Sequence, residues 1–138
     1  MAKKRYFSRA FSNAKKTKID GITFDSKLEA DKYIHLKVLE KAGKISDLKV
    51  QVPFELLTNQ DKKPNDIIHS LGKRKKILGF KYITDFTYIR NGQKVALDTK
   101  GRTTDVYKLK LKMFLACYPS YQFIEIYRDS KKNNFNIF

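Results

Sequence analysis

Hydrophobic residues recur along the chain with two different periods, and these periods predict the positions of helices and strands. From Ser26 the apolar residues fall on one side of a helix that we expect to end at Gly43. A second amphipathic helix is predicted to begin at Thr103 or Thr104, either of which can cap it, and to end before Pro119. The apolar stripe consists of Leu28, Leu36, Leu39 and Ala42 in the first helix and of Tyr107, Leu111, Phe114, Leu115 and Tyr118 in the second.

Four segments rich in β-branched and aromatic residues are predicted to be strands, and they cover residues 48–57, 80–90, 93–100 and 122–127. The dipeptide Asn91-Gly92 favours a two-residue hairpin between the second and the third strand. The polar segment 58–79 predicts a long loop after the first strand. The order helix, strand, strand, strand, helix, strand predicts an α/β fold in which a central mixed β-sheet is flanked by helices.

Length and composition indicate one folded domain preceded by a basic arm. A chain of 138 residues, 41% of them hydrophobic, fits a single domain over residues 19–138. Residues 1–18 carry seven Lys or Arg residues and no acid. No apolar run approaches the roughly 20 residues that a membrane-spanning helix needs, and no apolar segment of the secretory kind follows the basic start. We therefore expect a cytoplasmic protein without a membrane partner.

The net charge of +16 makes nucleic acid the expected partner, because such an excess repels itself unless a polyanion is bound. Subtracting the seven charges of the arm leaves +9 on the rest of the chain, so the domain is basic as well. The alternative is that the basic residues only keep the protein soluble. Candidate DNA contacts outside the helices, which are equally compatible with a loose tail and a solvated turn, are Lys3, Lys4, Arg5, Lys73, Arg74, Lys75 and Lys76.

The hairpin turn places three charged residues relative to one another. The register that follows from a two-residue loop at Asn91-Gly92 puts Asp85 opposite Asp98. Directly opposed side chains lie about 4.5–5.5 Å apart on one face of a sheet. Lys100, two residues beyond Asp98, shares that face. Two opposed carboxylates repel each other unless a shared proton, a basic side chain or a cation neutralises them.

An aspartate pair beside a lysine in a strongly basic chain indicates metal-assisted phosphodiester cleavage. Mg²⁺ binds through one or two carboxylates together with water and phosphate oxygens, and Mn²⁺ is the expected substitute. The alternative is an ordinary surface ion-pair cluster around Lys100. The apolar strands on both sides favour a central position over a peripheral one.

Glu29 is the third candidate acid. The pattern Ser26-x-x-Glu29 matches a capping box, in which the glutamate closes the start of the helix. Glu29 also falls within about 20° of Leu36 on the helical wheel, at the edge of the buried stripe. The two roles are compatible, and we expect the carboxylate to point toward the sheet.

The combination of Glu29 in a helix, Asp85 in a strand and Asp98-Thr99-Lys100 in the next strand resembles the PD-(D/E)xK nuclease superfamily. The core of that superfamily, a restriction-endonuclease-like fold, has the element order predicted above. This chain departs from the superfamily motif at Thr84, where the motif has proline. Short phage-encoded proteins related to phage Holliday-junction-resolving endonucleases are similar over about residues 13–127, and the endonuclease subunit of certain heteromeric transposases is similar in part. The similar segments are residues 20–30 (DGITFDSKLEA), 43–45 (GKI), 51–54 (QVPF) and 98–101 (DTKG).

The resemblance implies a Mg²⁺-dependent endonuclease with a defined set of site residues. Asp85 and Asp98 would ligate one or two ions, with Glu29 and the carbonyl of Thr99 as further ligands. Lys100 would orient the attacking water and stabilise the charge that develops on phosphorus. Gln51 either assists that placement or is an ordinary polar strand residue. Arg102, Lys108 and Lys112 would hold backbone phosphates.

The resemblance further implies a homodimer that acts on branched DNA, since symmetric cutting of a four-way junction needs two active sites. Two alternatives remain open. The first is a nuclease of transposition, restriction or non-specific DNA degradation. The second is a basic DNA-binding module that kept the fold without the chemistry. The chain has no glycine-rich phosphate loop, so we expect no nucleotide cofactor.

Overall fold

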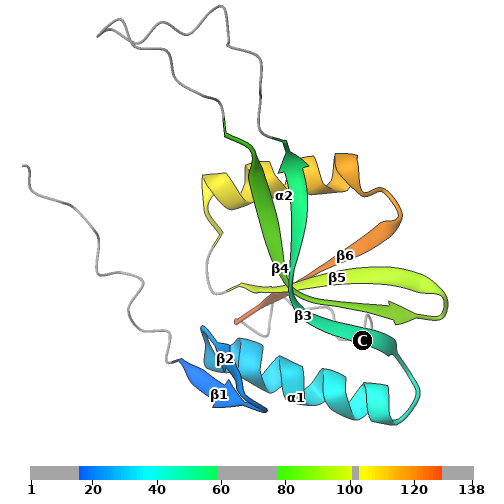
Figure 1. The fold of residues 1–138 in the computed structure, drawn as a ribbon. Coiled ribbons are helices and arrows are strands. Elements are labelled where there is room, and N and C mark those ends of the chain that lie inside the picture. The colour runs from blue at the N-terminus through cyan, green and yellow to red at the C-terminus, as the bar shows by residue number, and fades with distance from the viewer. Residues whose placement is uncertain (1–15, 59–77, 101–102, 129–138) are drawn as a thin grey trace, which may run out of the picture.

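The computed structural model describes residues 16–58, 78–100 and 103–128, which form a mixed α/β fold (Figure 1). The elements are β1 (Thr17–Ile19), β2 (Ile22–Phe24), α1 (Lys27–Lys41), β3 (Ser46–Leu57), β4 (Phe80–Arg90), β5 (Gln93–Lys100), α2 (Asp105–Cys117) and β6 (Tyr121–Tyr127). The candidate DNA contacts that lie outside the described residues are Lys3, Lys4, Arg5, Lys73, Arg74, Lys75, Lys76 and Arg102.

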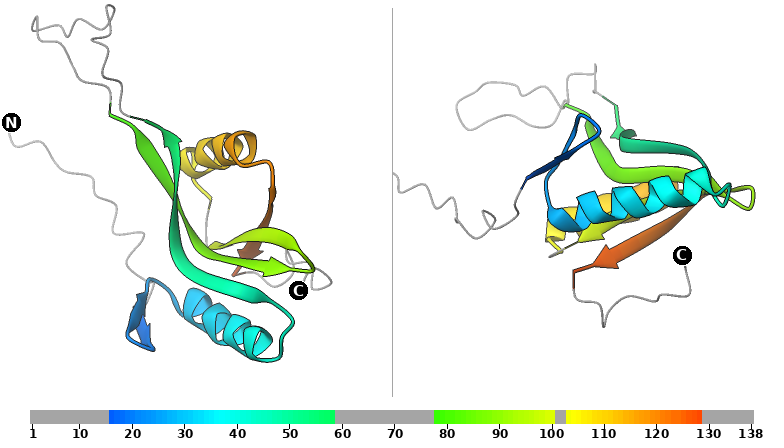
Figure 2. Two further views of the ribbon diagram at one scale, coloured as in Figure 1. Left: turned by 45° about the vertical axis from the view of Figure 1, so that its right-hand side comes forward. Right: turned by 90° about the horizontal axis from the view of Figure 1, so that it is seen from below.

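The larger of the two sheets described has the strand order β3-β4-β5-β6 and is mixed. β3, β4 and β5 are antiparallel neighbours, whereas β6 runs parallel to β5 because α2 connects the two. β3 and β4 form a long curved pair that reaches from the α1 side of the molecule to the α2 side (Figure 2). β1 and β2 form a separate small hairpin beside the start of α1.

The two helices cover opposite faces of the sheet. Alternate residues of β5 show this, because Val95 and Leu97 pack in the cluster under α1 while Ala96 packs in the cluster under α2. Each cluster is built around aromatic side chains, with Phe24, Tyr33 and Phe86 on the α1 side and Phe54, Tyr82 and Phe114 on the α2 side. Neither described helix has the length and apolar character needed to cross a bilayer.

The predicted element order from the first helix onward is confirmed, and β4 and β5 have the predicted bounds. Ser26 caps α1, and its side chain accepts a hydrogen bond from the backbone N–H of Glu29. Two members of the predicted apolar stripes are wrong: Ala42 is the exposed C-cap of α1, and Leu115 is 47% exposed on the outer side of α2. The β1–β2 hairpin was not predicted, because strands of three residues are too short to show an alternation.

Candidate functional site

Backbone pairing between β4 and β5 ends one residue before the two candidate aspartates. The register predicted from the hairpin turn holds as far as Phe86, which pairs with Leu97. Beyond that pair, side chains replace backbone groups: Asp98 Oδ1 accepts from the backbone N–H of Asp85 at 2.8 Å. In return, Asp85 Oδ2 accepts from the backbone N–H and the hydroxyl of Thr99, at 2.7 and 2.9 Å. Each aspartate is therefore held by the strand that carries the other.

The pairing of β4 with β3 is interrupted at the same residue. Val50 pairs with Phe86 and Val52 with Thr84, so the register places Gln51 opposite Asp85, but these two residues are not a ladder pair. Gln51 has a backbone φ of 53°, in the left-handed region that residues other than glycine adopt rarely. Its side chain is exposed and donates to the carbonyl of Thr23 at 3.2 Å. The predicted assistance of Gln51 to catalysis stays a prediction.

Lys100 shares a face with Asp98, as predicted, and forms an ion pair with it. The Nζ atom lies 2.9 Å from Asp98 Oδ2, and the hydroxyl of Tyr82 donates to the same oxygen. The Lys100 ammonium also lies over the ring of Tyr107, 4.1 Å from its centroid. The side chain of Asp98 is 1% exposed and that of Lys100 is 21% exposed. This is a buried pair with one face open, in contrast to the surface cluster considered as the alternative.

Burial is the main reason why the pKa of each aspartate is raised. For Asp85, hydrogen bonds from Thr99 and the charge of Lys100 lower the pKa in part, and the charge of Asp25 raises it. For Asp98, the charge of Lys100 and the N–H of Asp85 lower the pKa, and Glu125 raises it. Of the neutralising groups considered for the two aspartates, the structure shows a basic side chain, Lys100, whose charge lowers both pKa values. Each carboxylate also accepts from donors on the opposite strand.

Glu29 brings a third carboxyl group from α1 to these strands. It is 5% exposed, and its pKa is raised to about 7, first by burial and then by the charges of Asp85, Asp25 and Asp98. Repulsion from three carboxylates requires that Glu29 lies near all of them. The N–H of Glu29 is held by the Ser26 cap, and its carboxyl group lies near the aspartates of β4 and β5.

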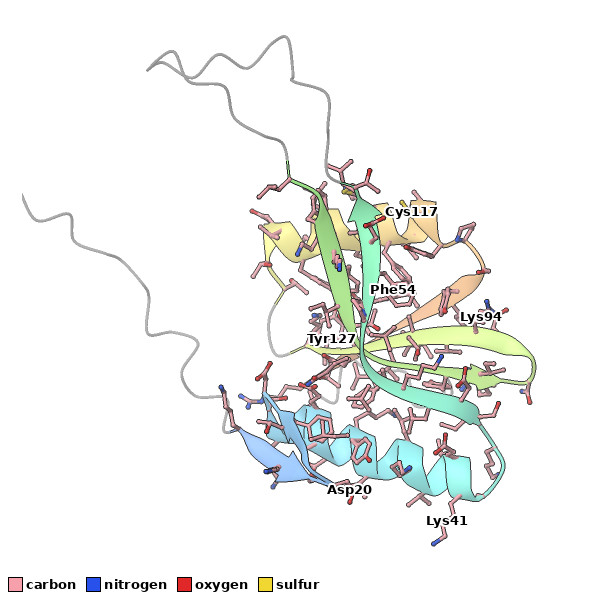
Figure 3. All side chains as sticks on the ribbon, viewed as in Figure 1. Asp20, Lys41, Phe54, Lys94, Cys117 and Tyr127 are labelled. Atoms are coloured by element: carbon pink, nitrogen blue, oxygen red, sulfur yellow. The ribbon has the colours of Figure 1, made fainter. Side chains whose placement is uncertain are left out.

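The structure adds acids and tyrosines that the sequence did not single out. Glu125 is the β6 partner of Asp98, and its carboxylate accepts from the hydroxyls of Tyr107 and Tyr127. The same contacts raise the pKa of Tyr107, after burial, and are the main cause of the raised pKa of Tyr127. Tyr127 lies where the strands converge in Figure 3. The two predicted phosphate contacts that are described, Lys108 and Lys112, are exposed on α2.

The atoms at this site that could bind a metal ion are carboxylate and hydroxyl oxygens. Both carboxylate oxygens of Asp98 accept from groups of the protein, whereas the bonds that the Asp85 carboxylate accepts from the described residues both involve Oδ2. Among the described residues, no group of three or more His, Cys, Asp or Glu side chains is placed so that it could hold a metal ion. The acids are thus close enough to repel one another without forming a closed coordination shell.

A family model described as "Protein of unknown function (DUF1064)" matches residues 9–134, which include every described element. The chain belongs to the DUF1064 family. Comparison with curated proteins and with solved structures finds no match. The acids, Lys100 and the tyrosines around them all lie inside the region matched by DUF1064, whereas Lys3, Lys4 and Arg5 lie before it.

Proposed function

We propose that this DUF1064 protein is a metal-dependent DNA endonuclease with a restriction-endonuclease-like core. We further propose that it is a homodimer selective for branched DNA. The observation that carries the proposal is the buried Asp98–Lys100 pair at 2.9 Å, joined through a hydrogen bond to Asp85 on the neighbouring strand, with the Glu29 carboxyl group of α1 near Asp85. The order α1-β3-β4-β5-α2-β6 supports it, since the resembling nucleases share that order.

Packing alone does not account for the concentration of charge at this point of the sheet. Removing a carboxylate from water costs several kcal/mol, and replacing a buried ion pair by apolar residues is often neutral or stabilising. Strongly shifted pKa values caused by burial and by specific charge partners are typical of functional sites. Glu29, Asp85 and Asp98 all have raised pKa values, and burial is the first cause for each.

The oxygen atoms of these side chains are suitable ligands for a hard divalent cation. Mg²⁺ prefers oxygen ligands and keeps several waters, so that one or two carboxylates are enough to hold it. Asp85, Asp98 and the Thr99 carbonyl would hold the ion, with Glu29 as a direct or water-mediated ligand, and Mn²⁺ suits the same oxygens. When bound, the ion would polarise the scissile phosphate and lower the pKa of a water molecule.

The side chains of the protein supply position and charge. Lys100, held between Asp98 and the face of Tyr107, provides a positive charge for a phosphate that approaches the open side of the pair. Glu29, with a pKa of about 7, holds or releases a proton on its carboxyl group near neutral pH. Lys108 and Lys112, exposed on α2, are available to backbone phosphates.

A second candidate is a DNA-binding module without catalysis. The contacts of Asp98 favour it, because both carboxylate oxygens already have partners within the protein. Oδ2 contacts Lys100 and Tyr82, and Oδ1 accepts from the N–H of Asp85. This candidate requires DNA binding that is independent of divalent cations, together with no cleavage of any DNA.

The test is incubation of the protein with four-way junctions and with plain duplex, with and without Mg²⁺. We expect cleavage that needs Mg²⁺ and is faster on the junction. Asp98→Asn should abolish cleavage and keep or strengthen DNA binding, because it removes a negative charge. Asp47→Asn is the matched control, since Asp47 forms an exposed ion pair with Lys49 and its left-handed backbone suits asparagine. Cleavage by Asp98→Asn at the rate of the control would refute the proposal.

A further inference from the structure

A second charged site lies in a cavity between α1 and the end of the β4–β5 hairpin. The cavity has a volume of about 240 Å³ and is lined by Lys32, Leu36, Leu39, Lys44, Ile45, Tyr88 and Arg90. Three of these seven residues are cations and none is an acid. The apolar residues form the remaining wall, which belongs to the core under α1. The cavity therefore presents positive charge against a partly apolar surface.

Lys32 is the unusual member of this group, because it is only 8% exposed. Its pKa is lowered to about 8, first by burial and then by the charge of Arg90. The Nζ atom contacts Nδ1 of His35 at 3.2 Å, and the pKa of that imidazole is lowered first by burial and then by the charge of Lys32. Cations that are withdrawn from water and also repel one another raise the free energy of the folded state. The same positive charges attract an anion that enters the cavity.

Tyr88 places a neutral hydrogen-bond donor at the same cavity. Its side chain is 4% exposed and lines the cavity. Burial raises the pKa of Tyr88, and the charge of Arg90 lowers it in part, so the phenol lies close to that arginine. A neutral phenol donates through its hydroxyl, so Tyr88 is suited to donate to an oxyanion bound beside Arg90.

We propose that this cavity binds a phosphate group, with Lys32, Lys44 and Arg90 as the cations and the Tyr88 hydroxyl as a neutral donor. A phosphate carries several acceptor oxygens, and the arginine fork and two ammonium groups match them. Leu36, Leu39 and Ile45 then contact the organic part of a phosphate ester. The phosphate comes either from a DNA strand or from a small free phosphate.

The position of the cavity is compatible with a DNA strand that also reaches the acids. Lys32 follows Glu29 by one turn of α1, and Arg90 follows Asp85 by five residues of β4. Five strand residues span about 17 Å, which is roughly five base steps at a rise of about 3.4 Å. The phosphate site itself goes beyond the proposed nuclease function and does not depend on it.

The first experiment measures binding of inorganic phosphate and pyrophosphate to the full chain by thermal unfolding, with chloride at equal ionic strength as the reference. Near saturation, we expect a rise in Tm on the order of 5 °C. Lys32→Met should abolish this rise, because it keeps the apolar stem and removes the ammonium. Lys41→Met is the matched control, since Lys41 lies at the end of α1 (Figure 3) and does not line the cavity.

Tyr88→Phe keeps the packing of the ring and removes only the hydroxyl, so it tests the site even if Lys32→Met folds poorly. We expect the unliganded Tm to stay within about 2 °C and phosphate affinity to fall about fivefold, as for the loss of one hydrogen bond.

The second experiment measures binding of a short duplex at several salt concentrations. If a DNA phosphate occupies the cavity, Lys32→Met reduces the slope of log affinity against log salt by about one, and Lys41→Met does not. If only free phosphate binds, the Tm responses differ between these variants while their duplex affinities agree. No difference between Lys32→Met and Lys41→Met in either experiment would overturn the proposal.

Discussion

Lys100 Nζ and Asp98 Oδ2 lie 2.9 Å apart on the α2 side of the sheet, and both residues belong to β5. Residues two positions apart share a face of a strand, so the pair forms within a single strand without help from the loops. Asp98 is buried on one side by Tyr82, while Lys100 remains partly open. The charge of Asp98 therefore depends on Lys100 more than on solvent.

Lys100→Met should lower the free energy of unfolding by about 2–4 kcal/mol, because it leaves Asp98 buried without its cation. Asp98→Asn in the same chain should recover most of this loss, since it removes the unpaired charge. Urea unfolding of the two single variants and the double variant gives the coupling energy. The exposed pair of Lys49 and Asp47, 3.6 Å apart, is the control and should couple by less than about 1 kcal/mol. Equal coupling of the two pairs would contradict the argument from burial.

Glu29 should make the stability of the metal-free protein depend on pH. Its pKa is raised from 4.5 to about 7, so the folded chain binds the proton more tightly than the unfolded chain. The stabilising contribution is fully present below pH 4.5 and is lost as the pH rises to about 7. Relative to Glu29→Gln, the wild type should lose on the order of 2 kcal/mol across this range. Urea unfolding in the presence of a chelator measures the difference.

Divalent cations give a second result at the same residue. Above pH 7 the Glu29 carboxylate is charged, and a bound cation should raise the Tm of the wild type more than that of Glu29→Gln. If Mg²⁺ stabilises both proteins equally, Glu29 does not contribute to holding the ion. If the pH profile of the wild type in chelator is as flat as that of the variant, the carboxyl group is not buried among the other acids.

Local signals in the sequence were enough to predict the bounds of β4 and β5 and the start of α1. The turn at Asn91-Gly92 joins two strands that are adjacent in sequence, and Ser26 caps the helix that begins at the next residue. The register therefore brought Asp85 close to Asp98. It could not show that the backbone pairing stops at Phe86, because the two aspartate side chains take over the hydrogen bonds there.

The other features of the site depend on contacts between distant segments. Glu125 pairs with Asp98 between parallel strands that α2 connects, and no short-range pattern in the sequence indicates that register. Tyr107 was predicted as an apolar helix position, which explains its burial but not its hydrogen bond to Glu125. The left-handed backbone of Gln51 is equally invisible in the sequence, because glutamine has no preference for that conformation.

Tyr107 should position Lys100 through its ring and stabilise Glu125 through its hydroxyl. Tyr107→Phe keeps the ring under the ammonium, so we expect catalytic activity within about threefold of the wild type and a loss of about 1 kcal/mol in stability. Tyr107→Leu removes the ring as well and should lower kcat at least tenfold with little change in KM. Steady-state cleavage and urea unfolding separate the two effects. Equal kcat for the two variants would show that the ring does not position Lys100.

Lys108 and Lys112 should contribute to DNA affinity through phosphate contacts from α2. They are four residues apart, so both lie on one face of the helix, and both are exposed. Each phosphate contact adds about 0.9 to the slope of log affinity against log salt concentration. Lys108→Ala together with Lys112→Ala should therefore reduce that slope by about two, and should weaken binding to junction and duplex alike. Lys37→Ala together with Lys41→Ala, which removes the same charge from the outer side of α1, should change the slope by less than one. If the two double variants reduce the slope equally, net charge rather than a contact surface on α2 determines DNA affinity.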